Sequence, residues 1–422
     1  MARKGMLPVG VLAAALIALL AIAPFASAAS DPLASGKTTM TLQKSFTNYL
    51  KTFGISVSKI SPAKLSGGKA TFNVTGGSLD PTTGKGTVNL GGGLKFKAGK
   101  KSATVKALVL NTEKKTLTGK VGGKKVKIAS IAGWSSKRSG FGANLTINKV
   151  KLTTAGAKQL NKATGYSKGK PKPFLGNKLI AKATAETQPA TVTVLPVGNM
   201  TFVGSPVLLT KLKNVEVKLQ TLGLTQQTGT TFTGPILGGT VSPAGTAGVV
   251  QSGIGIKMTQ NLPLQVGAIT TNITLGGIYI DLAAKTATVE VIAESNAESP
   301  AGSGKKPLNL GNLGRSSIAD IVVTGVTADP TTRTVGINSA GVLQAVSAEV
   351  LQGFVSVDQA YVEGGTELEF CKNPLAAPEG CAKQSEKDEA KALAQKNGAE
   401  VAKNKISAGE ALGVFSFVAQ AQ

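Results

Sequence analysis

The feature that most limits the fold is an internal repeat. The segment "GGSLDPTTGKGTVNLGGGLKF", which begins at Gly76, aligns without a gap with "GGTVSPAGTAGVVQSGIGIKM", which begins at Gly238. The two segments share glycines, a proline, a valine and a lysine at the same places. Three further pairs follow in the same order: 108–121 with 278–291, 150–160 with 335–345, and 174–188 with 411–422. Matches in one order predict two related domains in tandem.

Both copies have the pattern of β structure. Each begins with a turn, at Asp80-Pro81 or Ser242-Pro243, and continues as an alternating strand. The chain has 52 glycines and only 4% aromatic residues, which is typical of strands joined by many turns. Its 41% of hydrophobic residues can form a core. We therefore expect a mainly β protein with two tandem β-rich domains, each with one or two short helices.

The clearest predicted helix covers 44–54, "KSFTNYLKTFG". Apolar residues at helical spacing share one of its faces: Leu42, Phe46, Tyr49, Leu50 and Phe53. Another helix is expected in each copy within 150–160 and 335–345, where a strand enters a helix through a Thr or an Asn/Ser cap. The second copy also has an insertion at about 352–405, whose polar run is rich in helix formers, and we expect it on the surface.

The repeat predicts a first domain at 37–188, a linker at 189–194 and a second domain at 195–422. Charge divides the chain at nearly the same place. Residues 31–200 contain 29 Lys/Arg against four acids, a net of +25, whereas 201–422 contain 16 against 18, a net of −2. The basic half could bind an anionic envelope polymer, a lipid surface or an acidic ligand, or it could be a solvated surface without a partner.

The N-terminus predicts export. Residues 1–28 have the pattern of a cleaved secretory signal peptide: a charged start, a short apolar run and a small-residue end. The mature protein is then secreted or held at the cell envelope, and nucleic acid is not an expected partner. In that oxidising compartment, Cys371 and Cys381 are expected to form a disulfide.

Catalytic templates match poorly. The chain has no histidine, which removes the usual general base, the Ser-His-Asp and Cys-His arrangements and most zinc sites. The glycine clusters lie within strand patterns and not between a strand and a helix, so they are not phosphate loops. We expect no enzymatic activity and no catalytic residues.

The motifs "SFTNYL", "LDPTTGKGTVNLGGGLKF", "LVLNTEKKTLTGKV" and "VKLTTAGAKQL", in this order, resemble the HtaA domain. This domain is the haem-binding module of exported actinobacterial haem-uptake proteins. The resemblance covers most of 37–188 and, more weakly, 195–350 with 406–422. It implies a β-rich fold, haem as the cofactor, and a role in iron acquisition through haem or haem-carrying proteins.

The resemblance also implies a site. Tyr49 matches the family's axial ligand to haem iron, a role that suits a phenolate and ferric iron. Phe46 and Phe53 would flank the porphyrin, and lysines would pair with its propionates. The family's pocket has a histidine beside the tyrosine, and this chain has none; Lys97 or Lys100 would stand in as the cation.

Two alternatives remain open from the residues. Tyr49 can be an ordinary core aromatic on an apolar helix face. The chain as a whole can be a haem-binding or haem-relay protein, or a non-enzymatic envelope or adhesion protein whose basic domain holds anionic envelope polymers. The second copy lacks the tyrosine, so no ligand is expected there.

Overall fold

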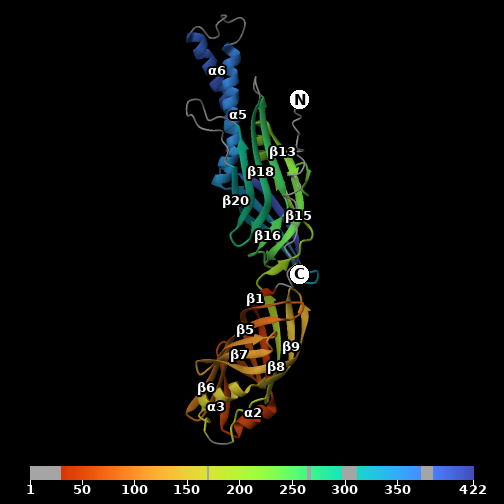
Figure 1. Cartoon of the computed structure of the whole chain (residues 1–422), viewed down its shortest axis with the longest axis vertical. Coiled ribbons are helices and arrows are strands. Elements are labelled where there is room, and N and C mark those ends of the chain that lie inside the picture. Colours follow the sequence, from red (N-terminus) through yellow and green to blue (C-terminus); the bar gives the residue numbers. More distant parts are fainter. Residues whose placement is uncertain (1–29, 169–170, 264–267, 297–310, 372–383) are drawn as a thin grey trace, which may run out of the picture. The chain divides into compact units, whose positions relative to one another are not determined.

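The computed structural model describes residues 30–168, 171–263, 268–296, 311–371 and 384–422 (Figure 1). Strands dominate, which confirms the mainly β class and the tandem β-rich arrangement. The chain divides into two compact units between Thr187 and Gln188, with the turn Ser139–Gly142 assigned to the second. None of the helices in these ranges is long and apolar enough to span a membrane. The predicted signal peptide, 1–28, lies outside the described residues.

The first unit is built on a sheet of ten strands. Its elements are β1 (Asp31–Leu42), α2 (Lys44–Lys51), β2 (Ile55–Ile60), β3 (Lys64–Ser66), β4 (Lys69–Leu79), β5 (Gly86–Ala98), β6 (Lys101–Asn111), β7 (Thr116–Val121), β8 (Lys124–Ser139), β9 (Gly142–Leu152), α3 (Thr154–Thr164) and β10 (Leu179–Pro189). Because β4 pairs with both β1 and β5, eight of these strands form a closed ring, β1-β4-β5-β6-β7-β8-β9-β10. Strands β2 and β3 add to β5 and β4.

Alternate residues of the ring strands point inward and form the core of the first unit. Phe72 of β4, Leu110 of β6, and Leu145 and Ile147 of β9 are fully buried there. The residues between them along each strand are mostly more exposed, as period-two patterning requires. The alternation read from the sequence therefore corresponds to an inner and an outer face of the ring.

The second unit repeats this order around a sheet of twelve strands. Its elements are β11 (Val192–Val194), β12 (Asn199–Gly204), α4 (Pro206–Asn214), β13 (Val217–Leu222), β14 (Gln226–Thr228), β15 (Thr231–Val241), β16 (Val249–Ser252), β17 (Gly255–Pro263), β18 (Ala268–Asp281), β19 (Thr286–Ser295), β20 (Gly311–Asp329), β21 (Thr334–Leu343), α5 (Ala345–Cys371), α6 (Gln384–Ala402) and β22 (Ala411–Gln420). The pairings close a ring of eight strands here too, β12-β15-β16-β18-β19-β20-β21-β22.

The sequence repeat is also a structural repeat. The hairpin β6–β7 corresponds to β18–β19, and in each a side-chain oxygen at the turn accepts a backbone N–H: Asn111 Oδ1 from Lys114 at 2.6 Å, and Asp281 Oδ1 from Ala284 at 2.8 Å. The residue that closes each turn has positive φ, 52° at Lys115 and 57° at Lys285. Residues that align in the sequence therefore occupy equivalent turns in the structure, and these turns fix the alignment of the two copies.

Two predicted boundaries differ from the structure. Part of the predicted linker 189–194 is strand β11, whose Val192 and Val194 are buried against the second core because they pair with β15. In the second copy the sequence predicts a helix that begins at an Asn338 or Ser339 cap, and this prediction is wrong. Strand β21 continues through both residues because it pairs on both sides, with β20 and β22, and α5 begins only at Ala345.

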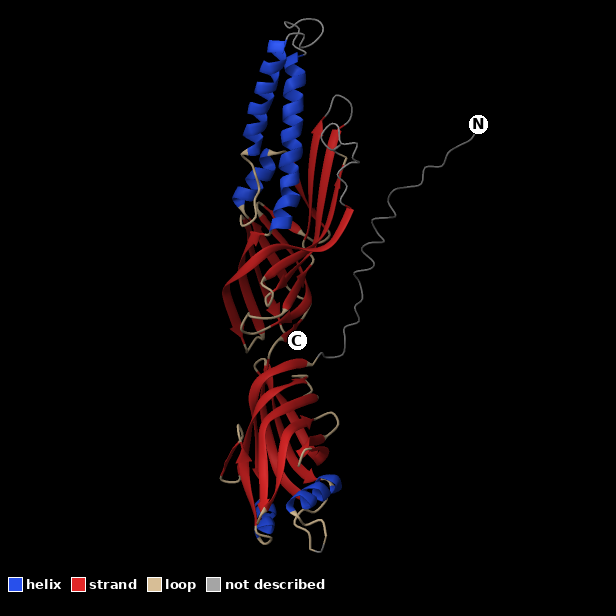
Figure 2. Cartoon of the chain, turned by 90° about the vertical axis from the view of Figure 1, so that its left-hand side faces the viewer, coloured by secondary structure: helices blue, strands red, loops and turns tan. Residues whose placement is uncertain are grey.

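In the first copy the helix predicted within 150–160 begins after a threonine cap, as expected. Thr153 caps α3 by accepting the N–H of Gly156 at 2.9 Å. The described residues of the predicted insertion lie mostly in two longer helices, α5 and α6, which pack against each other, whereas the helices of the first unit are short (Figure 2). Cys381 lies outside the described residues, so the predicted disulfide stays a prediction.

Candidate functional site

Helix α2 carries the tyrosine that the sequence singles out. Phe46 and Leu50, one turn apart, are its buried residues, and they fix which face of the helix packs on the core. The helix ends where Gly54, at φ 64°, donates its N–H to the Lys51 carbonyl at 2.9 Å. Tyr49 therefore lies on the flank between the core face and solvent, and it is half-buried.

The phenol of Tyr49 has one hydrogen-bond partner in the described structure. Its hydroxyl donates to the carbonyl of Lys172 at 3.2 Å, which is long for an O–H donor. Its ring meets that of Phe53 edge-on, with centroids 5.2 Å apart and planes at 69°. The Tyr49 side chain is thus half-buried, and its hydroxyl is held by a single long hydrogen bond.

Tyr166 completes this group, and sequence reasoning missed it. Its ring also meets that of Phe53 edge-on, with centroids 5.8 Å apart and planes at 88°, and its hydroxyl donates to the Phe53 carbonyl at 2.9 Å. We call Tyr49, Phe53 and Tyr166 the tyrosine cluster. The only local signal was the position of Tyr166 directly after Gly165, which ends α3 in the left-handed conformation at φ 88°.

The lysine found beside Gly165, the residue that precedes Tyr166, is not one of the two predicted from the sequence. The side chain of Lys101 lies across Gly165, where an added Cβ would be 2.7 Å from its Cδ and 3.4 Å from its Nζ. Lys97 is exposed on β5 between Ser56 and Ser102, and it points away from the core because its neighbour Phe96 points inward. Lys100 is exposed in the turn between β5 and β6.

Phe46 lies in the core and not beside the phenol. Its ring packs 6.5 Å from that of Phe174, which in turn meets Phe96 edge-on at 5.4 Å. All three rings are buried. Of the two phenylalanines expected to flank a porphyrin, the structure brings only Phe53 to Tyr49.

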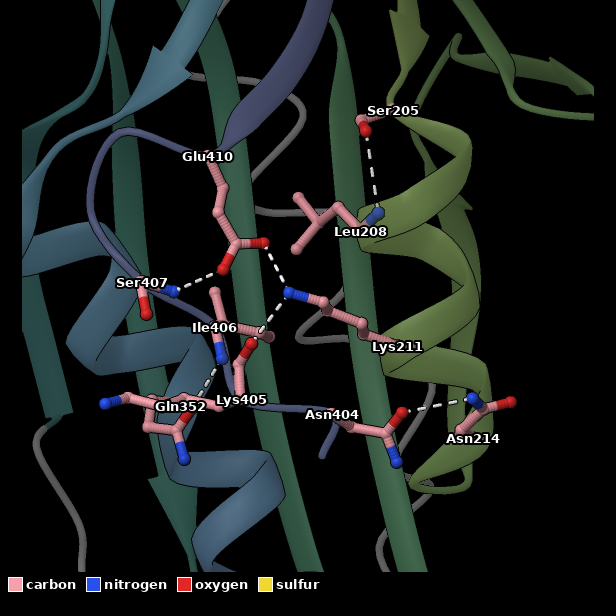
Figure 3. A network of polar contacts seen from close by, with 10 residues as sticks. All are labelled: Ser205, Leu208, Lys211, Asn214, Gln352, Asn404, Lys405, Ile406, Ser407 and Glu410. Atoms are coloured by element: carbon pink, nitrogen blue, oxygen red, sulfur yellow. Dashed lines mark hydrogen bonds and ion pairs between the residues drawn. The ribbon is translucent and has the colours of Figure 1, made fainter. Parts of the chain in front are cut away.

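The second unit shows what the fold does at the same helix position. Helix α4 has an equivalent buried pair, Leu208 and Leu212, and Lys211 stands between them where Tyr49 stands in α2. Lys211 Nζ donates to the Lys405 carbonyl at 2.7 Å and forms an ion pair with Glu410 Oε2 at 2.6 Å (Figure 3). In both units this position therefore contacts the carbonyl of a lysine that precedes the last strand.

Further polar contacts hold this part of the second unit together. Asn214 Nδ2 donates to Asn404 Oδ1 at 3.1 Å, and Gln352 Oε1 accepts the N–H of Ile406 at 2.7 Å (Figure 3). Glu410 Oε1 also accepts the N–H of Ser407 at 2.8 Å. Helix α4, helix α5 and the segment before β22 are thus joined by charged and neutral hydrogen bonds, whereas Tyr49 makes one long neutral bond.

The turn after β4 has a structural role. Burial acts to raise the pKa of Asp80, but hydrogen bonds from Thr83 Oγ1 and from the N–H groups of Thr82 and Thr83, with the nearby Arg138 charge, outweigh it and lower the pKa from 3.8. Across the described residues, no group of three or more His, Cys, Asp or Glu side chains could hold a metal ion.

No family model matches the sequence, and the search of curated proteins gives no match. The structure is similar to the C-terminal domain of HtaA from Corynebacterium glutamicum, at 15% identity and a TM-score of 0.29, over 37% of this chain and 99% of that one. It is also similar to the heme-binding protein HtaB from the same organism, at 14% identity and a TM-score of 0.31, over 55% of this chain and 95% of that one.

Proposed function

We propose that this chain is an exported, non-enzymatic protein that binds or relays haem through Tyr49 of its first unit. The observation that carries the proposal is the contrast between Tyr49 and Lys211 at the same helix position. Lys211 is held by an ion pair and a short hydrogen bond, whereas the Tyr49 phenol is half-buried with one long neutral bond. This contrast supports a ligand at Tyr49, since Lys211 already has strong partners of its own.

The residues around Tyr49 fit a ferric porphyrin in their chemistry. Tyr49 Oη would hold the iron as a phenolate, and haem would supply a ferric centre that prefers such an oxygen. Once deprotonated, the phenol no longer donates to the Lys172 carbonyl, so only one weak bond is given up. Phe53 and Tyr166 offer apolar ring edges beside Tyr49, and Lys101 lies against Gly165, next to Tyr166 in the chain.

Hemin titration of the full chain tests the proposal. We expect a Soret shift and a phenolate-to-iron charge-transfer band in the wild type, and neither in Tyr49→Phe, which keeps the ring and loses only the hydroxyl. Tyr279→Phe is the matched control, because Tyr279 lies in the second unit with the Arg315 guanidinium 3.5 Å over its ring. Far-ultraviolet circular dichroism should be the same for all three proteins.

Two results would contradict this function. A wild-type protein without any spectral change at micromolar hemin does not bind haem. A charge-transfer band that persists in Tyr49→Phe and disappears in Tyr166→Phe would move the ligand to the other phenol of the tyrosine cluster.

A further inference from the structure

Three lysines lie side by side across neighbouring strands of the first unit. Lys106 on β6 is directly opposite Lys120 on β7, and Lys120 is directly opposite Lys125 on β8. We call these three residues the lysine row. Adjacent strands are ~4.8 Å apart, so the three lysines start from neighbouring positions along one line across the sheet.

The lysine row is on the outer face of the ring. All three side chains are exposed, while their neighbours Val105 and Val121 are buried. Strands β6, β7 and β8 contain no acidic residue, and no ion pair of the row is seen within the described residues. Like charges directly opposite each other destabilise a sheet, so this arrangement works against folding.

The second unit shows that the fold does not require such a row. The register places Gly276, Glu290 and Arg315 at the three equivalent positions of β18, β19 and β20. There Glu290 and Arg315 attract each other, with Arg315 Nε 3.2 Å from Glu290 Oε1. One copy therefore carries an opposite-charge pair where the other carries consecutive positive charges.

We propose that the lysine row is a docking surface for a linear polyanion whose charges are closely spaced phosphates. Charge complementarity carries this choice of partner. A phosphate chain laid across the strands would place negative charge between adjacent ammonium groups and remove the repulsion along the row. This proposal does not depend on haem binding at Tyr49, which lies on a different element.

The residue types favour phosphate recognised by charge. Lysine ammonium is a compact point charge that binds phosphate, without the planar fork by which arginine grips a carboxylate in two places. Strands β6 and β7 contain no arginine and no aromatic residue, and on β8 Trp134 packs against the core, nine residues along the strand from Lys125. We therefore expect recognition of charge density and not of nucleotide sequence.

The test uses the full chain, long-chain inorganic polyphosphate as the probe, and fluorescence anisotropy over a range of salt concentrations. Replacing the whole lysine row by glutamine removes three positive charges and keeps the side chains polar. At about 0.7 in slope for each lysine that contacts phosphate, the plot of log affinity against log salt should become shallower by about 2. Binding at low salt should fall by about tenfold or more, since several ion pairs with phosphate are lost.

A second triple variant with the same charge change is the control. Three exposed lysines on β1, β3 and β4 lie opposite only uncharged residues at the pairings seen, and they are also replaced by glutamine: Lys37, Lys64 and Lys69. This control should keep most of the affinity and nearly the wild-type salt slope.

Each other outcome overturns the proposal. Equal losses in the two triple variants would show diffuse attraction to the net charge of the unit. Wild-type binding in both variants, or no binding by the wild type, would show that the row is not a docking surface. Tighter binding of poly-glutamate or of single-stranded RNA than of polyphosphate, at equal charge concentration, would show that the ligand class is wrong.

Discussion

The repulsion along the lysine row can be measured as stability. Lys120→Glu gives β7 the acid that Glu290 supplies in the second unit, and it faces Lys106 on one side and Lys125 on the other. At ~6 Å in water, two unit charges interact by about 0.7 kcal/mol, which screening at physiological salt reduces to about 0.3 kcal/mol. Two repulsive pairs become two attractive ones, so we expect a gain of about 1 kcal/mol in the free energy of unfolding.

The assay is urea unfolding of the full chain followed by tryptophan fluorescence. The chain has a single tryptophan, Trp134, and it packs against the core of the first unit, so the signal reports that unit alone. A gain of about 1 kcal/mol should also raise the melting temperature by about 2–4 °C. The gain should shrink in high salt, because screening weakens both repulsion and attraction.

Lys69→Glu is the matched control for this prediction. Lys69 is also an exposed strand lysine, but it lies opposite Thr41 and Ser66, which are uncharged. It makes the same change in net charge without changing a direct pair, so its effect should be clearly smaller. An equal gain in both variants, or a loss in Lys120→Glu, would refute the reasoning from cross-strand charge.

Three further predictions concern single polar groups. Asp80→Ala removes the acceptor of three hydrogen bonds in a buried turn and should lower the free energy of unfolding by about 1–3 kcal/mol. Because the pKa of Asp80 is lowered in the folded state, this stability is present above its ordinary pKa and is lost as the pH falls through its folded pKa, which chemical unfolding at a series of acidic pH values would show. Burial, and after it the charge of Glu216, raise the pKa of Asp358, so its ionised carboxylate costs stability above that raised pKa. Asp358→Asn should therefore stabilise the second unit at neutral pH. The gain should vanish below pH 3.8, the ordinary pKa of the group, as calorimetry of the wild type and the variant can show. Lys211→Met breaks a partly exposed ion pair and leaves the Lys405 carbonyl without this donor, which should lower the free energy of opening the segment before β22 by about 1 kcal/mol. Hydrogen exchange of the backbone amides in that segment should therefore become faster.

The sequence predicts the repeated β architecture well because both of its signals are local. Alternation along a strand and a turn residue at a fixed offset need no knowledge of distant parts of the chain. Thus the turns at Asn111 and Asp281 match in the structure as they do in the sequence. The errors occur where pairing with another strand decides whether a segment forms a strand. Val192–Val194 and Asn338 are in strands because other strands pair with them, and the residues next to them in the sequence do not predict this pairing.

The candidate site shows the same limit. Helical spacing puts Tyr49 on the apolar face of α2 together with Phe46 and Leu50, whereas in the structure only those two are buried and Tyr49 is half-buried beside them. Its partners do not follow, since the hydroxyl of Tyr166 reaches the Phe53 carbonyl across 113 residues of sequence, and that of Tyr49 reaches Lys172 across 123. The choice of Lys97 rested on where the family resemblance puts the missing histidine, whereas strand alternation places the Lys97 side chain on the outer face.

The two copies differ most informatively where they share a backbone position. At the helix position the second copy has Lys211 paired with Glu410, and at the row position it has Glu290 paired with Arg315. At the same two places the first copy has Tyr49 on one weak bond and Lys120 between two other lysines. Because one backbone supports both arrangements, folding alone does not require the polar groups that the first copy leaves without strong partners. The two proposed ligands, an iron centre at Tyr49 and phosphate at the lysine row, would each supply a partner that folding does not.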